Sequence, residues 1–153
     1  MSFTLLLTCV GGELAPQMIR FLQDSPRHDV TVVGVDARED AAGRHFADHF
    51  ATVPTGDSDE YVEAIAQLVS QHSVDMVLPT SDEEALALAS QRERIEVGGT
   101  LLACASIDVL STVSNKASAY RRFAELGLRT PEWVEAHTLT DIAAAAKDIF
   151  GRK

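Results

Sequence analysis

Residues 3–12, F-T-L-L-L-T-C-V-G-G, form a nearly continuous apolar run that ends in a pair of glycines. Such a run, short and without polar alternation, is typical of a strand buried on both faces. Apolar side chains then recur at helical spacing, at Leu14, Met18, Ile19 and Leu22. Because a buried strand followed directly by a helix is the repeating unit of parallel sheets, this stretch predicts an α/β fold.

The same alternation continues along the chain. Four more apolar runs are predicted as buried strands, and segments with helical periodicity separate them. The strands are expected at 29–35, 50–53, 74–78 and 100–103, and the later helices near 61–69, 85–89, 106–110, 117–126 and 142–150, with Asp57–Asp59 as the acidic start of the first of these. Right-handed crossovers then give a Rossmann-like three-layer sandwich with a mostly parallel five-stranded sheet, most simply in the order 3-2-1-4-5.

Composition limits the class of protein. The chain has 153 residues, 46% of them hydrophobic, which is enough for one domain with a sizeable core. A net charge of −10 argues against nucleic-acid binding. No apolar run is long enough to span a membrane and no basic leader is evident, so we expect a cytoplasmic protein. Cys9 and Cys104 lie in apolar runs and are expected to be buried thiols, without a metal or a disulfide.

A domain boundary is expected near the segment 115–131, N-K-A-S-A-Y-R-R-F-A-E-L-G-L-R-T-P. It predicts a lysine-bearing helix closed by Gly127, followed by a turn at Pro131. The remaining residues, 132–153, offer one extended run at 133–136 and one helix, too little apolar surface for a core. We therefore expect a domain at 1–114, a connecting helix and turn at 115–131, and the truncated start of a second domain. The last helix should bury its apolar side on this domain or on a second copy, so a homodimer is possible.

In the expected topology, the chain reverses direction between the first and fourth strands, and ligands bind beyond the carboxyl ends there. Residues 10–13 and 78–83 would then border one crevice. Gly11 and Gly12 allow two interpretations: a backbone that approaches a phosphate or carboxylate, or a tight turn that needs positive φ. The dinucleotide motif G-x-G-x-x-G is not met, which weakens an NAD-dependent oxidoreductase hypothesis. Asp36 is placed either to contact a ribose or to cap a turn.

Residues 81–84, S-D-E-E, fit a capping box in which Ser81 caps a helix and Glu84 answers it. Capping leaves Asp82 and Glu83 unexplained, and these carboxylates are candidates to face an amine. The segment 45–49, H-F-A-D-H, superficially resembles an inverted zinc-protease motif, but a surface helical turn explains it better and no metal is expected.

A small basic cluster, Lys116 with Arg121 and Arg122, is either a solvated helix face or an anion site where Lys116 holds a nucleotide phosphate.

Together these residues resemble the N-terminal (pre-ATP-grasp) domain of ATP-grasp ligases, in particular the carbamoyl-phosphate-synthase-large-subunit-like group. The likeness lies in the order and spacing of its pieces and covers nearly the whole chain. The pieces are Leu5–Thr8, Gly11–Ala15, Val33–Asp36, Gly43–Asp48, Asp75–Glu84 and Asn115–Pro131.

The resemblance implies ATP-dependent carboxylate–amine ligation through an acyl phosphate, with ATP and Mg²⁺ as cofactors of the longer parent. It implies substrate-binding roles in the two bends and a phosphate contact at Lys116. The substrate-binding residues would be Gly11, Gly12, Glu13, Thr80, Ser81, Asp82 and Glu83. The ATP clamp and the Mg²⁺ carboxylates would lie after Lys153, in the remainder of the ATP-grasp domain. This chain alone should then bind ATP weakly or not at all and catalyse nothing. The alternative is a stand-alone Rossmann-like nucleotide-binding or sensor module.

Overall fold

The computed structural model describes residues 2–151, and the chain divides into two compact units, Met1–Leu110 and Ser111–Lys153. The first unit contains a five-stranded sheet in the order β3-β2-β1-β4-β5, as the sequence predicted. Every neighbouring pair of strands is parallel. The strands are β1 (Ser2–Leu7), β2 (Asp29–Asp36), β3 (His49–Thr52), β4 (Met76–Leu78) and β5 (Leu101–Leu102).

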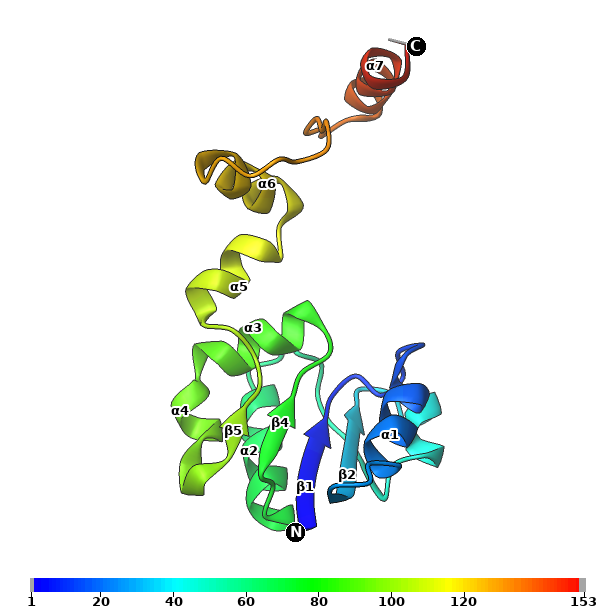
Figure 1. Cartoon of the computed structure of the whole chain (residues 1–153), viewed down its shortest axis with the longest axis vertical. Coiled ribbons are helices and arrows are strands. Elements are labelled where there is room, and N and C mark those ends of the chain that lie inside the picture. Colours follow the sequence, from blue (N-terminus) through cyan, green and yellow to red (C-terminus); the bar gives the residue numbers. More distant parts are fainter. Residues whose placement is uncertain (1, 152–153) are drawn as a thin grey trace. The chain divides into compact units, whose positions relative to one another are not determined.

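Helices cover both faces of this sheet, with α1 on one face and α2 on the other (Figure 1). The helical elements of the first unit are α1 (Ala15–Gln23), η1 (Ala42–His45), α2 (Tyr61–His72), α3 (Asp82–Ser90), α4 (Arg92–Ile95) and η2 (Val97–Gly99), and α5 (Ile107–Val113) runs across the boundary between the units. Leu6 and Val33 point toward α2, while Leu7 and Val32 point toward α1. This alternation along strands that are buried on both faces explains why their sequences read as unbroken apolar runs.

Two local features differ from the sequence predictions. The acidic residues Asp57–Asp59 lie in the turn before α2, which begins only at Tyr61. The helices α4 and η2 were not anticipated, because they are too short to show a helical period in the sequence. Residues 133–136, expected as an extended run, lie in a segment without helix or strand.

The second unit contains α6 (Lys116–Glu125) and α7 (Leu139–Phe150). Asn115 caps α6 by accepting a hydrogen bond from Ser118 N, and Gly127 follows the helix with φ +71°, as the sequence predicted. A capping box between Thr138 and Asp141 starts α7. None of the described side chains of α7 is buried, so its apolar positions have no core of their own.

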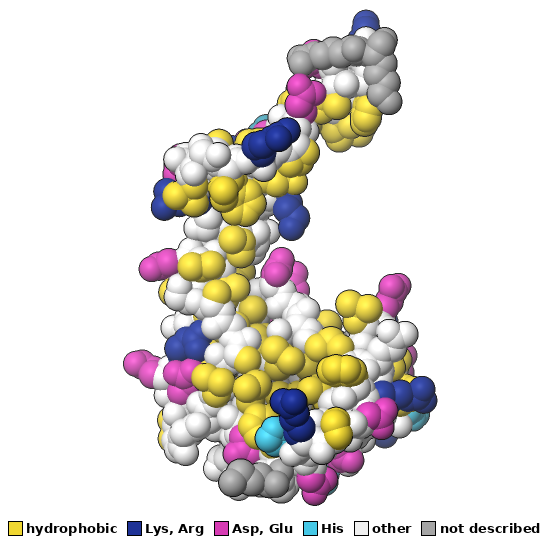
Figure 2. Space-filling view, viewed as in Figure 1, with side chains coloured by type: hydrophobic (Ala, Val, Ile, Leu, Met, Phe, Trp, Pro, Cys, Tyr) yellow, Lys and Arg dark blue, Asp and Glu magenta, His cyan; other side chains and the backbone are white. Residues whose placement is uncertain are grey.

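The sheet face that carries α1 is only partly covered. Beside α1 lies a hollow of about 370 Å³ that apolar side chains dominate, and Figure 2 shows apolar groups gathered over this face. The lining residues are Phe3, Leu5, Phe21, Leu22, Ser25, His28, Val30, Met76 and Leu78.

Candidate functional site

The bends that follow β1 and β4 lie side by side at the carboxyl end of the sheet, as the topology predicted. Parallel pairing brings Leu7 opposite Leu78, and each chain then turns away. Immediately beyond, Thr80 N donates to Thr8 Oγ1 (3.2 Å) and Thr80 Oγ1 donates to Thr8 O (2.7 Å). Two segments about seventy residues apart are therefore joined by hydrogen bonds into the two walls of one crevice.

The first bend reverses at Cys9, which has φ +51°, while neither Gly11 nor Gly12 has a positive φ. Of the two interpretations of these glycines, the tight turn that needs a positive φ does not apply. The glycines serve close approach instead: a Cβ at Gly11 would lie 2.9 Å from Asp36 Oδ2, and one at Gly12 3.3 Å from Cys9 O. A small side chain is required here by the neighbouring atoms rather than by the backbone angle.

Asp36, at the end of β2, holds this bend in place. It is buried, and its two carboxylate oxygens accept hydrogen bonds from Gly11 N (2.6 Å) and Arg38 N (2.9 Å). These hydrogen bonds are those of the capping role, one of the two roles considered for Asp36. In the part of the chain that the structure describes, Glu13 N and Leu14 N have no acceptor, so these two donors remain available to an anion at the start of α1.

The second bend is fixed by Ser81, whose Oγ accepts a hydrogen bond from Glu84 N (3.3 Å) and caps α3 as predicted. The other half of the predicted capping box, a hydrogen bond from the backbone N–H of Ser81 to the Glu84 side chain, is replaced by other contacts. The Glu84 side chain turns into the protein and accepts hydrogen bonds from Thr8 Oγ1 (2.6 Å) and Ser81 Oγ (3.0 Å). Asp82 and Glu83 remain exposed in the first turn of α3.

Carboxylates make the crevice electronegative. Burial raises the pKa of the Cys9 thiol, and the charges of Glu84, Asp36 and Glu83 raise it further. Burial also raises the pKa of Glu84, although the hydrogen bonds from Thr8 and Ser81 oppose this shift. Cys9 and Cys104 are half-buried rather than fully buried, and neither forms a disulfide.

Tyr61 lies beneath the crevice with no exposed surface, and burial and the charge of Glu84 raise its pKa. Among residues 2–151 its hydroxyl makes no hydrogen bond of good geometry, although it lies near enough to the Glu84 carboxylate to lower the pKa of Glu84. An unsatisfied buried hydroxyl costs about 1–3 kcal/mol, so we expect Tyr61→Phe to leave the free energy of unfolding unchanged or to raise it by about 1 kcal/mol. Urea unfolding measures this, with Tyr61→Leu as the control that opens a cavity and destabilises. A clear loss of stability in Tyr61→Phe would contradict the prediction.

Lys116 belongs to the second unit, where it begins α6. The other members of its expected basic cluster are engaged in ion pairs, Arg121 with Glu135 and Arg122 with Glu125. Of these three residues, Lys116 is the one without an ion-pair partner within the described residues. The cluster therefore offers one lysine rather than three cations.

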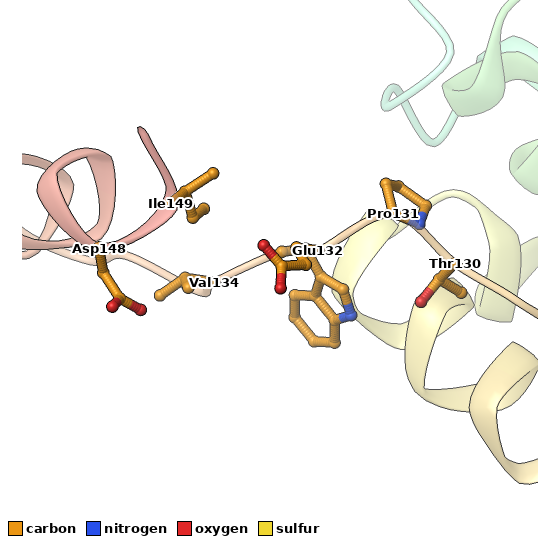
Figure 3. A pocket seen from close by; sticks show the side chains of 7 residues that line it. Thr130, Pro131, Glu132, Val134, Asp148 and Ile149 are labelled. Carbon is orange, nitrogen blue, oxygen red and sulfur yellow. The ribbon is translucent and has the colours of Figure 1, made fainter. Parts of the chain in front are cut away.

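The second unit also contains a hollow of about 420 Å³ between residues 130–134 and the end of α7 (Figure 3). Ile149 lines it from α7, and Trp133 lines it from the opposite segment while its ring packs against Tyr120 at 5.6 Å between centroids. Trp133 and Ile149 are half-buried, while Ile142 and Phe150 are exposed.

Residues 2–151 contain no group of three His, Cys, Asp or Glu side chains arranged to hold a metal ion, the segment 45–49 included. No helix within the same range combines the length and the apolar character needed to cross a bilayer.

Sequence reasoning did not assign Thr8, Tyr61 or the Glu84 carboxylate to the crevice. The signal available in the sequence is the position of Glu84, three residues after Ser81. A capping box already accounts for this spacing, so the spacing does not indicate that the carboxylate is buried. Burial of its carboxylate depends on β1 and α2, which are distant in sequence.

Comparisons with solved structures show which known proteins share this fold. Glycinamide-RNase-transformylase T from Mycobacterium tuberculosis is 18% identical, with a TM-score of 0.64 over 94% of this chain and 38% of that one. N5-carboxyaminoimidazole synthetase from Staphylococcus aureus, complexed with ADP, is 18% identical, with a TM-score of 0.64 over 97% of this chain and 37% of that one. The biotin carboxylase domain of a single-chain bacterial carboxylase is 17% identical, with a TM-score of 0.59 over 97% and 34%.

The fold is that of the N-terminal, pre-ATP-grasp domain of ATP-grasp ligases. Residues 5–103 match the PylC-like N-terminal domain family, and the chain belongs to that family. No curated protein sequence matches the chain significantly. The chain spans less than two fifths of the length of each of these three structures.

Proposed function

We propose that this chain is the substrate-side N-terminal part of an ATP-dependent carboxylate–amine ligase, similar to the carbamoyl-phosphate synthase large subunit, that works through an acyl phosphate. One observation carries the proposal: the bends after β1 and β4 are joined at Thr8 and Thr80, in a domain of the PylC-like N-terminal family. We place the domain at 1–114, the connecting helix and turn at 115–131, and the start of the ATP-grasp domain at 132–153.

The crevice binds the non-nucleotide substrate. Within the first bend, Gly11 and Gly12 keep the backbone close to the ligand, and the N–H groups at Glu13 and Leu14 meet a carboxylate or phosphate group. In the second bend, the hydroxyls of Thr80 and Ser81 already bond Thr8 O and Glu84, so these two residues shape the wall. Exposed Asp82 and Glu83 are then the groups that contact the substrate amine.

ATP and Mg²⁺ are cofactors of the longer protein. Lys116 approaches a phosphate, but one lysine at a helix end does not make a nucleotide site, and phosphoryl transfer needs metal ions and a positioned clamp. The remainder of the ATP-grasp domain supplies these groups, so residues 1–153 alone bind ATP weakly and catalyse no ligation. The same domain, or a second copy of this chain, covers Ile142 and Phe150 of α7, which are exposed.

The alternative is a stand-alone Rossmann-like nucleotide-binding module in the cytoplasm. Asp36, the residue positioned for a ribose, is committed to Gly11 N and Arg38 N, which disfavours this alternative. Calorimetry of this chain with ADP, ATP and NADH separates the two hypotheses. Micromolar affinity for any of them would support the module and contradict the ligase proposal.

In the protein encoded by the complete reading frame, Asp82→Asn combined with Glu83→Gln should raise the KM for the amine substrate. A hydrogen bond to a charged group contributes about 1.5–3 kcal/mol, less when it is exposed, so we expect an increase of roughly tenfold or more. The kcat should change much less, because these groups bind the substrate before chemistry. ADP release over a panel of amines and carboxylates gives both constants. Glu93→Gln, which removes an exposed carboxylate on α4 outside the crevice, is the control, and equal KM values in the two variants would contradict the assignment.

A further inference from the structure

A single carboxylate oxygen joins the two walls of the crevice. Glu84 Oε2 accepts the hydroxyl of Thr8, which follows β1, and the hydroxyl of Ser81, which precedes α3. Glu84 as a whole is only 8% exposed. Gly56 packs against it from the loop before α2, where a Cβ would lie 3.0 Å from Glu84 N. Glu84 therefore has little freedom to move away from these two donors.

The link continues from Glu84 to the backbone of the second bend. Because the Thr8 hydroxyl proton is directed at Glu84, a lone pair on the same Oγ1 is left to accept Thr80 N–H at 3.2 Å. The orientation of the Thr8 hydroxyl, and with it the acceptor for Thr80 N–H, thus depends on Glu84. Hydrogen bonds to an ionised acceptor are roughly twice as strong as neutral ones.

We propose that Glu84 is a positioning residue whose ionised carboxylate holds the bend after β4 against the bend after β1, and that protonation of Glu84 loosens this link. The proposal rests on the proposed function only in taking the crevice as the substrate site. It adds a proton-dependent contact that fixes the distance between the N–H groups of the first bend and the carboxylates of the second.

Several titratable groups face Glu84 from the neighbouring elements. They are Asp36 at the end of β2, Cys9 after β1 and Tyr61 on α2, with Glu83 next to it on α3. The loop before α2 contributes uncharged Gly56. Burial raises the pKa of Glu84 above the ordinary glutamate value; Thr8, Ser81 and the nearby Tyr61 hydroxyl lower it in part, and the charge of Asp36 adds to the increase.

The stability of the fold and the strength of the link between the bends should change in opposite directions with pH. A carboxyl group whose pKa is raised by folding makes the fold less stable as the pH rises from the ordinary glutamate value through the raised value. The link between the bends should strengthen over the same range, because it needs the ionised form. A merely structural role of Glu84 would not give opposite trends.

The test is an NMR titration of the whole chain that needs no ligand. The Glu84 carboxyl resonance reports its protonation, and exchange of the Thr80 amide, corrected for the intrinsic pH effect, reports the link. We expect Thr80 protection to fall several-fold, up to roughly tenfold, as Glu84 becomes protonated. Glu84→Gln keeps an acceptor oxygen but cannot titrate, so its Thr80 protection should not depend on pH. Glu84→Met should show low protection at every pH, and Glu93→Gln should behave as the wild type.

Constant Thr80 protection while Glu84 titrates would overturn the proposal, and so would the same pH dependence in Glu84→Gln as in the wild type. If Glu84→Met does not fold, these two comparisons still decide. Failure of the proposed function gives a different result. The link would then titrate as expected, while the KM for the amine in the complete protein would not differ between wild type and Glu84→Gln at any pH.

Discussion

Replacing Gly43 with alanine is expected to lower the free energy of unfolding of the first unit by about 3 kcal/mol or more, within the upper range for overpacked cores. An alanine Cβ would lie 2.4 Å from Val10 O and 2.6 Å from Val10 Cβ. Gly43 N already donates to Val10 O (2.9 Å), so the two segments cannot separate without losing a hydrogen bond. Rotation of a side chain cannot relieve the contact, because Val10 O belongs to the backbone. Urea unfolding measures the loss.

Gly98→Ala is the matched control for this prediction. Gly98 has φ +74° and no heavy atom near the position of an added Cβ, so alanine there meets only the strain of a left-handed backbone, about 1–2 kcal/mol. A loss in Gly43→Ala no larger than that in Gly98→Ala would contradict the steric argument. Because Val10 adjoins Gly11, relief of the clash should also shift amide resonances in the bend after β1.

The second large effect is expected at Arg92, whose guanidinium holds the end of β5. One nitrogen donates to Leu102 O (2.9 Å) and Glu96 Oε1 (3.0 Å), and the other donates to Cys104 O (2.8 Å) and Ala105 O (3.0 Å). A lysine cannot reproduce this planar fork and would leave carbonyl groups without a donor. The side chain is 30% exposed, so water can replace part of the loss. We expect Arg92→Lys to cost about 2 kcal/mol and Arg92→Met about 3 kcal/mol.

Arg94→Lys is the control, since Arg94 lies two residues away and pairs with Gln91 and Glu63 at the surface. Exposed ion pairs contribute about 0–1 kcal/mol, so this variant should unfold close to the wild type. Denaturant midpoints at unchanged slope give both values. Equal midpoints for Arg92→Lys and Arg94→Lys would show that the fork at β5 does not stabilise the unit.

The crevice was accessible to sequence reasoning because it follows from topology. Once the order of the strands is known, residues after β1 and β4 must meet, and the contact between Thr8 and Thr80 confirms this. The binding roles of Glu13, Asp82 and Glu83 remain predictions. Each of the remaining assignments depended on which hydrogen-bond partner a side chain has in the folded protein. The Asp36 carboxylate accepts hydrogen bonds from backbone N–H groups. The Glu84 carboxylate accepts one from the Thr8 hydroxyl rather than from the backbone N–H of its own N-cap residue.

The sequence by itself determined the strands and their order in the sheet, the long helices, and the position of the crevice. These features follow from local periodicity and from the handedness of crossovers, and neither needs knowledge of a distant residue. Tertiary structure decided which side chains became buried and paired: Glu84 beneath the crevice, the close packing of Gly43 on Val10, and the fork of Arg92 at β5. Each of these contacts joins residues that belong to different segments of the chain. The free energy of a buried polar or close-packed group depends on that partner, which no local pattern records.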